Sequence, residues 1–435
     1  MAVAGQALAG GLGIREQSAS AQGASFAGSA AGGDLSSSFW NPAAIATADY
    51  GLLTESHTAL ISADFDVRAE SISVLPGSVL GASTTEVNDR GEIDPLVLLA
   101  SSYAAWRMND DFVLGLAINS PFGSKNKVDN QTWSGQYHFR SSELLTVNTT
   151  LMASYRVAPG LSIGAGPQIQ YLSLNIKANP SGGLAPTQGS SEIDGDDIGV
   201  GYTVGVLWQP SEWTSIGLGF RSAVSHEVEG EATASRGRLT TGTFLGTVAF
   251  APVDFRAKLE TPDILTFSVR QALSTTTRLL GTVEWTNWSV LDEVDFIAAS
   301  AGGPAILPVS PGQTVNILEF NWNDGWFFAL GGEWDYSKSL TLRAGAAYEV
   351  SPIREAGQRK INIADSNRVW LSAGATMALT AATSVDFAYT HIFFDDAPID
   401  SLSSSPGTAT TPVRRFVGTA DQDADIVALS LKTRW

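Results

Sequence analysis

The residues best suited to acid–base, nucleophilic or metal chemistry are few and widely separated. The four histidines are His57, His138, His226 and His391, and none has the spacing of a metal site or of a nucleophile motif. Cysteine is absent, which excludes thiol chemistry, a cysteine metal site and a disulfide framework. We interpret the histidines as ordinary strand or loop positions. We therefore expect no enzyme activity, no bound metal and no cofactor.

Acidic residues are the other candidates for chemistry. The stretch at residues 194–197, and the alternate aspartates from Asp421 to Asp425, could hold Ca²⁺ or could be solvated loop charge, and the second interpretation is simpler. The glycine-rich run Ser181-Gly182-Gly183 lacks the lysine and helix context of a phosphate loop. A net charge of -18 argues against nucleic acid as a partner, because phosphate binding needs a basic surface.

The hydropathy of the chain is that of a membrane protein without membrane helices. Hydrophobic residues make up 44% of the 435 residues, and the mean hydropathy is +0.06. The longest apolar run, Pro95 to Ala100, is far shorter than the ~20 residues that a spanning helix needs. Only helices and closed sheets satisfy every backbone polar group in lipid, so a membrane protein of this composition has to be a β-barrel.

Alternating polarity supports this fold class. From Tyr50 onward we find about 14 segments with a period of two residues. In the last segment Val427, Leu429 and Leu431 share one face, while Ser430 and Lys432 lie on the other. One apolar face and one polar face suit a strand with lipid outside and water inside.

Short and long connections alternate along the chain, as they do in outer-membrane barrels with brief periplasmic turns and extended outer loops. The terminal Trp435 closes an alternating strand, which is typical of the bacterial barrel-assembly signal. We therefore predict an all-β, antiparallel transmembrane barrel in the bacterial outer membrane. Short turns are expected near residues 109–110, 158–159, 210–211, 273–274, 337–338 and 380–381; long loops are expected near 67–92, 121–142, 177–196, 229–255, 298–315, 351–366 and 396–423.

The first part of the chain differs from the rest. Residues 1–49 are rich in Gly, Ala and Ser and have no sustained period, so we expect a plug there and the barrel over residues 50–435. A barrel of about 14 strands is wider than its own side chains can fill and would leak without a plug. Ala7-Leu8-Ala9 followed by Gly10 has the form of an export cleavage site, and we interpret residues 1–8 as a start residue and the remnant of a trimmed signal.

Three motifs, spread over most of the chain, resemble those of the FadL-type family of outer-membrane transporters for long-chain fatty acids and hydrocarbons. The motifs are Asn41-Pro42-Ala43 in the expected plug; Pro121-Phe122-Gly123 with the following Trp133-Ser134-Gly135-Gln136-Tyr137; and Ser351-Pro352-Ile353 with Arg359, Ile361 and Asp365-Ser366-Asn367-Arg368-Val369-Trp370.

The resemblance implies a mechanism. The ligand is captured in an outer hydrophobic groove, passes to a lumenal pocket and leaves sideways through a kink in the third strand, here Pro121-Phe122-Gly123. Proline cannot donate to a strand ladder and glycine tolerates bulge geometry, although Pro121 could also simply end a strand. The family's gating residue near the N-terminus corresponds to Leu12 or Ile14. Asn41, Pro42 and Ala43 belong to the gate in this view, or form only a capped turn.

The expected ligand follows from the basic residues of the chain. Fatty-acid binders of the family carry a basic residue after the fifth strand, and Lys177 lies one position from it; a solvated strand end would also explain Lys177. Their second basic residue has no counterpart, since no Lys or Arg occurs between Trp288 and Trp326. A carboxylate in an apolar pocket is costly unless paired, which favours a neutral hydrocarbon. For the outer groove the candidates are Leu184, Phe244, Leu245, Val248 and Phe250, which could instead pack within their own loops.

The combined hypothesis is passive transport of hydrophobic small molecules by a monomer in contact with outer-membrane lipid and lipopolysaccharide. The alternatives are a non-specific aqueous porin and, less simply, an outer-membrane lipid hydrolase. Trp40, Trp133, Trp285, Trp288 and Trp326 are expected to pack the plug or form the interfacial girdle rather than contact ligand.

Overall fold

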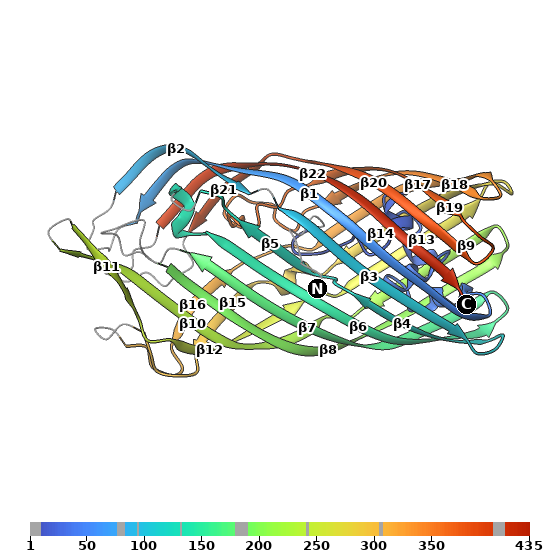
Figure 1. Ribbon diagram of the computed structural model, residues 1–435, viewed down its shortest axis with the longest axis horizontal. Coiled ribbons are helices and arrows are strands. Elements are labelled where there is room, and N and C mark those ends of the chain that lie inside the picture. Colours follow the sequence, from blue (N-terminus) through green and yellow to red (C-terminus); the bar gives the residue numbers. More distant parts are fainter. Residues whose placement is uncertain are drawn as a thin grey trace.

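The computed structural model describes residues 10–75, 83–93, 95–130, 133–178, 190–240, 243–303, 308–402 and 414–435, with the backbone alone for 236–240 and 243–249. Its strands form one closed antiparallel barrel of 14 strands, so the predicted fold class is confirmed (Figure 1). Several barrel strands are divided by bends and therefore carry two labels. The strands are β1 (Gly51–Val74), β2 (Ser83–Ile93), β3 (Leu96–Arg107), β4 (Phe112–Asn119), β5 (Gly123–Lys127), β6 (Ser141–Ala158), β7 (Leu161–Ala178), β8 (Ser190–Ser211), β9 (Thr214–Arg221), β10 (Val224–Thr240), β11 (Thr243–Ala249), β12 (Val253–Thr261), β13 (Ile264–Ala272), β14 (Thr277–Thr286), β15 (Glu293–Ala298), β16 (Thr314–Glu319), β17 (Gly325–Ser337), β18 (Leu340–Val350), β19 (Arg368–Ala378), β20 (Thr383–Phe394), β21 (Ala397–Leu402) and β22 (Arg414–Arg434).

The first and last strands close the barrel. β1 pairs with β22 from Leu53↔Arg434 to Val74↔Arg414, and on its other edge it pairs with β3 and β2. The short turns lie at the end that holds the C-terminus, on the right in Figure 1, and the long connections lie at the other end. At that outer end β1, β8 and β10 run further than the sequence pattern indicates. Polar residues can continue a strand ladder there because strand pairing needs no apolar face outside lipid.

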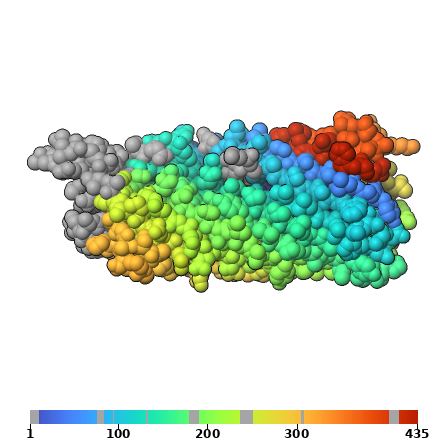
Figure 2. Space-filling model, turned by 60° about the horizontal axis from the view of Figure 1, so that its bottom comes forward, coloured from blue at the N-terminus to red at the C-terminus, as the bar shows by residue number. Residues whose placement is uncertain are grey.

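Because successive side chains of a strand point to opposite faces, the outer face of the barrel is apolar. On β22 the outward Leu429 is 52% exposed, whereas its neighbours Ala428 and Ser430 are buried. Figure 2 shows how residues from about 90 to 250, coloured cyan to yellow-green, form one continuous outer wall. In the described part of the chain, no helix is long and apolar enough to cross a bilayer.

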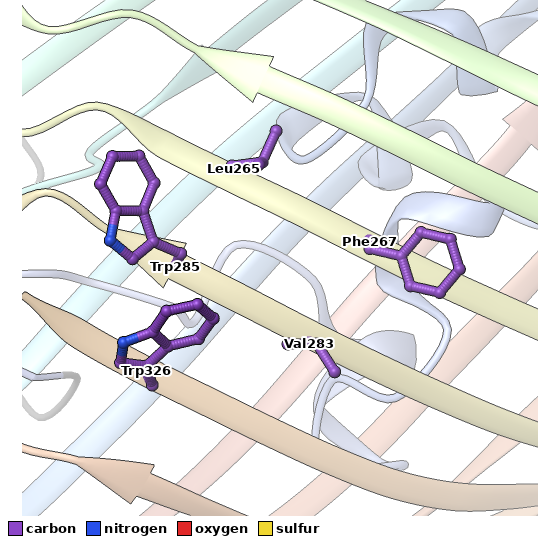
Figure 3. A pocket seen from close by; sticks show the side chains of 5 residues that line it. All are labelled: Leu265, Phe267, Val283, Trp285 and Trp326. Atoms are coloured by element: carbon purple, nitrogen blue, oxygen red, sulfur yellow. The ribbon is translucent and has the colours of Figure 1, made fainter.

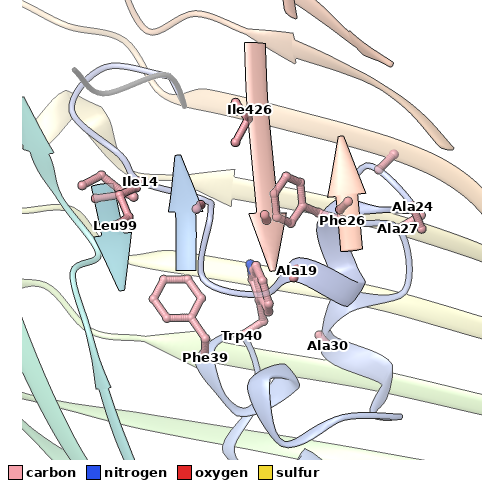
Figure 4. Packing of buried hydrophobic residues seen from close by; sticks show 14 of the residues in the cluster. Ile14, Ala19, Ala24, Phe26, Ala27, Ala30, Phe39, Trp40, Leu99 and Ile426 are labelled. Atoms are coloured by element: carbon pink, nitrogen blue, oxygen red, sulfur yellow. The ribbon is translucent and has the colours of Figure 1, made fainter. Parts of the chain in front are cut away.

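Residues 10–48 lie inside the barrel as a chain of short helices, seen in dark blue in Figure 1 and close by in Figure 4. Ser18 and Asn41 cap two of these helices through their side chains. The plug packs on itself through Phe26, Phe39 and Trp40, which share one buried cluster with Ile426 of the wall (Figure 4). The helices are α1 (Ala19–Gln22), η1 (Ser29–Ala31), η2 (Leu35–Phe39) and η3 (Pro42–Thr47) in the plug, η4 (Ser134–Tyr137) between β5 and β6, and η5 (Trp288–Val290) between β14 and β15.

Inward-facing glycines let the plug backbone touch the wall. A Cβ atom on Gly217 would lie 1.9 Å from the carbonyl oxygen of Ala30, and one on Gly219 would lie 1.8 Å from that of Trp40. Both positions are on β9, where any larger residue would displace the plug. These glycines on β9 thus form part of the surface on which residues 10–48 dock.

Candidate functional site

The third barrel strand is broken where the sequence places Pro121-Phe122-Gly123. β4 ends at Asn119 and β5 begins at Gly123. On one side the strand continues along β6, where Asn119 pairs with Asn148 and Gly123 with Leu145, so that one extra residue bulges out. On the other side the ladder between β3 and β4 stops at Ser102↔Ile118.

The edge of β3 beyond this point, residues 96–101, pairs with β1 but has no described strand partner on the side of β5. Pro121 offers no N–H group with which to continue the ladder. Leu96 and Leu98 point outward here and are 69% and 50% exposed, as expected of residues that face lipid. The barrel wall therefore has a break between its second and third strands.

Residues 10–17, which we name the strap, cross this break from inside. The Ile14 N–H donates to the Pro121 carbonyl at 2.8 Å, and the Gly123 N–H donates to the Leu12 carbonyl at 2.9 Å. Gly13 and Phe122 face each other in an antiparallel bridge. The strap thus supplies the hydrogen bonds that a neighbouring wall strand would otherwise make.

Gln17, at the end of the strap, contacts both edges of the break. Its carbonyl accepts hydrogen bonds from the Ser101 hydroxyl at 2.9 Å and the Tyr103 hydroxyl at 3.0 Å, both on β3. Its side-chain amide donates to the Ser120 carbonyl at 2.8 Å and to the Ile14 carbonyl at 3.1 Å. Gln17 is 2% exposed. It was not among the residues suggested by the sequence, because no local pattern marks it.

Next to the strap lies a cluster of buried apolar side chains, which we name the lumenal apolar cluster. The Phe122 and Trp288 rings are 5.7 Å apart, and the Trp288 and Trp322 rings are 5.4 Å apart. Leu12 joins this cluster, whereas Ile14 packs with Leu99 in the plug core (Figure 4). The cluster consists of Leu12, Phe122, Leu172, Leu174, Val228, Phe255, Ala257, Trp288, Leu291, Val294, Phe296, Phe320, Trp322 and Ile353.

Charged groups from distant strands also hold the strap. Arg15 binds Glu284 on β14 at 2.7 Å and Glu349 on β18 at 3.3 Å, and its guanidinium lies 3.7 Å from the centre of the Phe327 ring. These groups are buried, so removing either partner would leave an uncompensated charge in the lumen. The sequence pattern could not reveal this pairing, since the partners are brought together only by closure of the barrel.

Asn41, Pro42 and Ala43 lie far along the plug from the strap. The Asn41 side-chain oxygen accepts from the Ala43 N–H at 3.0 Å, which is the capped turn considered above. Its amide nitrogen donates to the carbonyls of Ala30 at 2.8 Å and Val206 at 2.9 Å. Since Val206 belongs to β8, this motif fastens the plug to the wall.

Of the residues suggested for ligand binding, the structure describes the side chains of Lys177 and Phe250. Lys177, at the end of β7, forms a half-exposed ion pair with Glu192 at 2.9 Å. Leu184 lies outside the described residues, as do the side chains of Phe244, Leu245 and Val248 on β11. Phe250 follows β11 and is half-buried. The groove stays a prediction.

Some of the tryptophans lie inside the barrel and others face outward. Trp40 packs the plug and Trp288 packs against Gly11 of the strap. Trp285 and Trp326 face outward around a hollow of about 250 Å³ that they share with Leu265, Phe267 and Val283 (Figure 3). For Trp133 the expectation of plug or girdle was wrong. Trp133 immediately precedes η4 and packs against Phe416 at 5.8 Å, because the connection after β5 folds over the outer end of the barrel.

Comparison of the chain with known proteins identifies its family. The family model described as outer membrane protein transport protein (OMPP1/FadL/TodX) matches residues 1–435. The chain belongs to this family and is an outer-membrane protein.

Individual relatives are distant but match nearly full length. The long-chain fatty acid transport protein of Escherichia coli O6:H1 is 25% identical over 409 residues, with 88% of this chain and 86% of the relative covered. Outer membrane protein P1 of Haemophilus influenzae is 26% identical over 426 residues, covering 89% and 87%. A Pseudomonas aeruginosa FadL homologue has the same fold, with a TM-score of 0.81, 19% identity and coverage of 98% and 99%. The Pseudomonas putida toluene transporter TodX gives a TM-score of 0.68 at 16% identity, with the same coverage.

Proposed function

We propose that the protein carries hydrophobic small molecules passively across the outer membrane and releases them sideways through the break between β3 and β5. The observation that carries the proposal is the wall break, which among the described residues is covered by the strap, with the lumenal apolar cluster beside the strap. Phe122 belongs to both features, since its backbone pairs with the strap and its ring contacts Trp288. A ligand that displaces Leu12 would loosen the cover over the break.

The ligand class we propose is long-chain fatty acids or hydrocarbons, with a neutral hydrocarbon favoured. The matched relatives include one named for long-chain fatty acids and one named for toluene. Around the lumenal apolar cluster the described cations Arg15 and Arg368 already bind carboxylates, and Arg359 already donates to the carbonyls of Ile353, Asp365 and Pro398. A ligand carboxylate would therefore enter an apolar site without a ready counter-charge, at a cost of several kcal/mol.

We further propose a division of labour along the chain. Residues up to 49 act as plug and gate, with Leu12 and Ile14 moving and Asn41, Pro42 and Ala43 holding the plug in place. Residues 50–435 form the wall as a monomer, with lipid against its exposed leucines and lipopolysaccharide around its outer end. No chemical step is assigned to the protein, so we place it outside the enzymes.

A proline substitution tests the proposed exit. In Pro121→Val the new N–H group and extended backbone would continue the third strand towards β3. Each added ladder bond stabilises the closed wall by about 1 kcal/mol. We expect uptake of a radiolabelled alkane or fatty acid by cells that depend on this protein to fall about tenfold, which corresponds to about 1.4 kcal/mol.

The matched control is Pro167→Val on β7, where the strand is paired with β6 and β8 on either side of the substitution. Its uptake should equal that of the parent. Equal uptake by both variants would reject the exit. Large ligand-independent ion conductance in planar bilayers would favour the porin alternative, and cleavage of phospholipid esters would favour the hydrolase.

A further inference from the structure

The strand ladder along one edge of β8 is interrupted. β8 pairs with β9 as far as Thr203↔Arg221 and with β10 from Asp196↔Glu229 onward, and no described strand pair joins the residues between these points. β6 and β7 separate this interruption from the break at β5. We name it the seam; it consists of residues 197–202 on β8 and residues 222–228 opposite them.

Two glycines let the opposite strand cross the inner face of β8 instead of joining its edge. Gly199 and Gly201 alternate with outward residues such as Val200, so a side chain on either glycine would point inward. A Cβ atom on Gly199 would lie 2.8 Å from the carbonyl oxygen of Ser225, and one on Gly201 would lie 2.7 Å from the hydroxyl of Ser222. The two strands therefore overlap at the seam without a backbone ladder.

At one end of the seam, side chains replace the missing ladder. The Asp197 carboxylate accepts from the Glu227 N–H at 3.3 Å, and its Oδ2 lies 3.0 Å from Nδ1 of His226. Nε2 of His226 lies 3.1 Å from the side-chain oxygen of Gln170 on β7. The His226 side chain is fully buried, whereas that of Asp197 is 26% exposed, so water can solvate the carboxylate when the contact opens.

At the other end, Ser222 holds β8. Its hydroxyl accepts from the Tyr202 N–H at 2.9 Å, and its own N–H donates to the Tyr202 carbonyl at 2.9 Å. A side-chain contact opens by a change of rotamer, whereas a paired strand leaves only when several ladder bonds break together. The wall can therefore part at the seam while β8 keeps its pairing with β7.

The seam lies at the outer margin of the apolar band. The outward residues of β8 are apolar at Ile198 and Val200, which are 65% and 73% exposed, and acidic at Asp194 and Asp196. Charged side chains stay out of the hydrocarbon region of a bilayer. The outer leaflet therefore reaches the seam.

The lumenal apolar cluster borders the seam on the inner side. Val228 belongs to both, and Leu172 of the cluster pairs with Asp197 across β7 and β8. A molecule that passed between the two strands would thus leave the apolar outer face and enter apolar surroundings again.

We propose that the seam is a second side opening, through which neutral apolar molecules dissolved in the outer leaflet reach the lumenal apolar cluster, with Asp197 and His226 as its latch. The proposal rests on the proposed use of that cluster as the ligand pocket. The route passes neither the outer groove nor the strap. A fatty-acid carboxylate would pass beside the like charge of Asp197, so the class admitted is an uncharged hydrocarbon.

A removable disulfide tests the proposal. The chain has no cysteine, and the Cβ position of Gly201 is near enough to the Ser222 hydroxyl for a disulfide between cysteines placed there. The double variant Gly201→Cys/Ser222→Cys is reconstituted in liposomes that contain a neutral alkane bearing a diazirine, and is then illuminated. Labelling of the buried Phe255 and Phe296, relative to the lipid-facing Leu429, should be about tenfold lower in the oxidised form than after reduction, which corresponds to about 1.4 kcal/mol.

Two further variants complete the test. Ala344→Cys/Ala373→Cys joins outward cross-strand partners in the continuous ladder of β18 and β19, and its oxidation should leave the labelling unchanged. Asp197→Ala removes the latch and should raise the labelling severalfold. Heat-modifiable migration confirms a folded barrel in each case. Equal labelling of the oxidised and reduced seam variant, or no rise in Asp197→Ala, overturns the proposal.

Pro121→Val separates the seam from the exit at the break. If Pro121→Val lowers uptake while the seam disulfide changes nothing, the exit stands and the seam is rejected. If the disulfide lowers the labelling while Pro121→Val leaves uptake unchanged, the seam stands and the exit is rejected.

Discussion

At the scale of single residues, Gln17 joins the two edges of the wall break. The substitution Gln17→Ala would remove the amide that donates to Ser120 and leave a buried carbonyl without its partner, which costs about 1–3 kcal/mol. We expect the strap to open more often, seen as faster amide hydrogen exchange over residues 10–17. Gln271→Ala is the control, because that amide lies near the short-turn end and donates to Ala272. Unchanged exchange in the Gln17 variant would show that the backbone contacts suffice.

Some residues of the wall break could be predicted from the sequence and others could not. Pro121 was identifiable because proline limits its own backbone, and the structure places it at the break. Gln17 and Trp322 were not identifiable, since no local pattern brings Gln17 to β3 and Ser120, or Trp322 to Gly11. In the sequence, Glu284 and Glu349 look like ordinary inward-facing strand residues. Only closure of the barrel places them beside Arg15.

At the scale of elements, the plug is tied to the wall through η3. Asn41→Asp would keep the oxygen that caps η3 but would lose the amide donors to Ala30 and Val206 and add a buried charge. We expect the plug to be destabilised by about 2–4 kcal/mol, seen as raised basal conductance and faster proteolysis of the plug. Asn109→Asp is the control, because Asn109 is exposed and uses only its oxygen as an acceptor in a turn. Similar behaviour of the two variants would reject the tie.

Element boundaries followed the sequence closely at one end of the barrel and less closely at the other. The turn after Ala158 and the turn after Ser337 fall where proline or polar residues interrupt the alternation. At the outer end, β1 continues to Val74 and β10 to Thr240, inside the ranges expected to be loops. Above the membrane no apolar face is required, so the two-residue pattern disappears while the strand ladder continues.

At the scale of the whole molecule, the barrel and its strap are separable. β1 and β22 close the wall without any contribution from residues 10–17. A variant lacking residues 10–17, with the export cleavage site kept before Ser18, should still show heat-modifiable migration. Its basal ion conductance in planar bilayers should exceed that of the parent severalfold, since the strap no longer covers the break. A variant that fails to fold would show that the strap is needed for assembly, which contradicts this separation.

The unpaired edge of β3 has a consequence for the energetics of opening. A membrane barrel normally has no unpaired strand edge, because backbone amide groups that face hydrocarbon without a partner cost several kcal/mol each. Residues 96–101 form such an edge on the side of β5, and the side chains of Leu96 and Leu98 point outward. Once the strap withdraws, the Pro121 carbonyl and the Gly123 N–H group on the opposite edge also lose their partners, and they regain them when the strap returns. The proposed exit would therefore close again without any added energy, and a passing molecule would need to hold it open only for the duration of its passage.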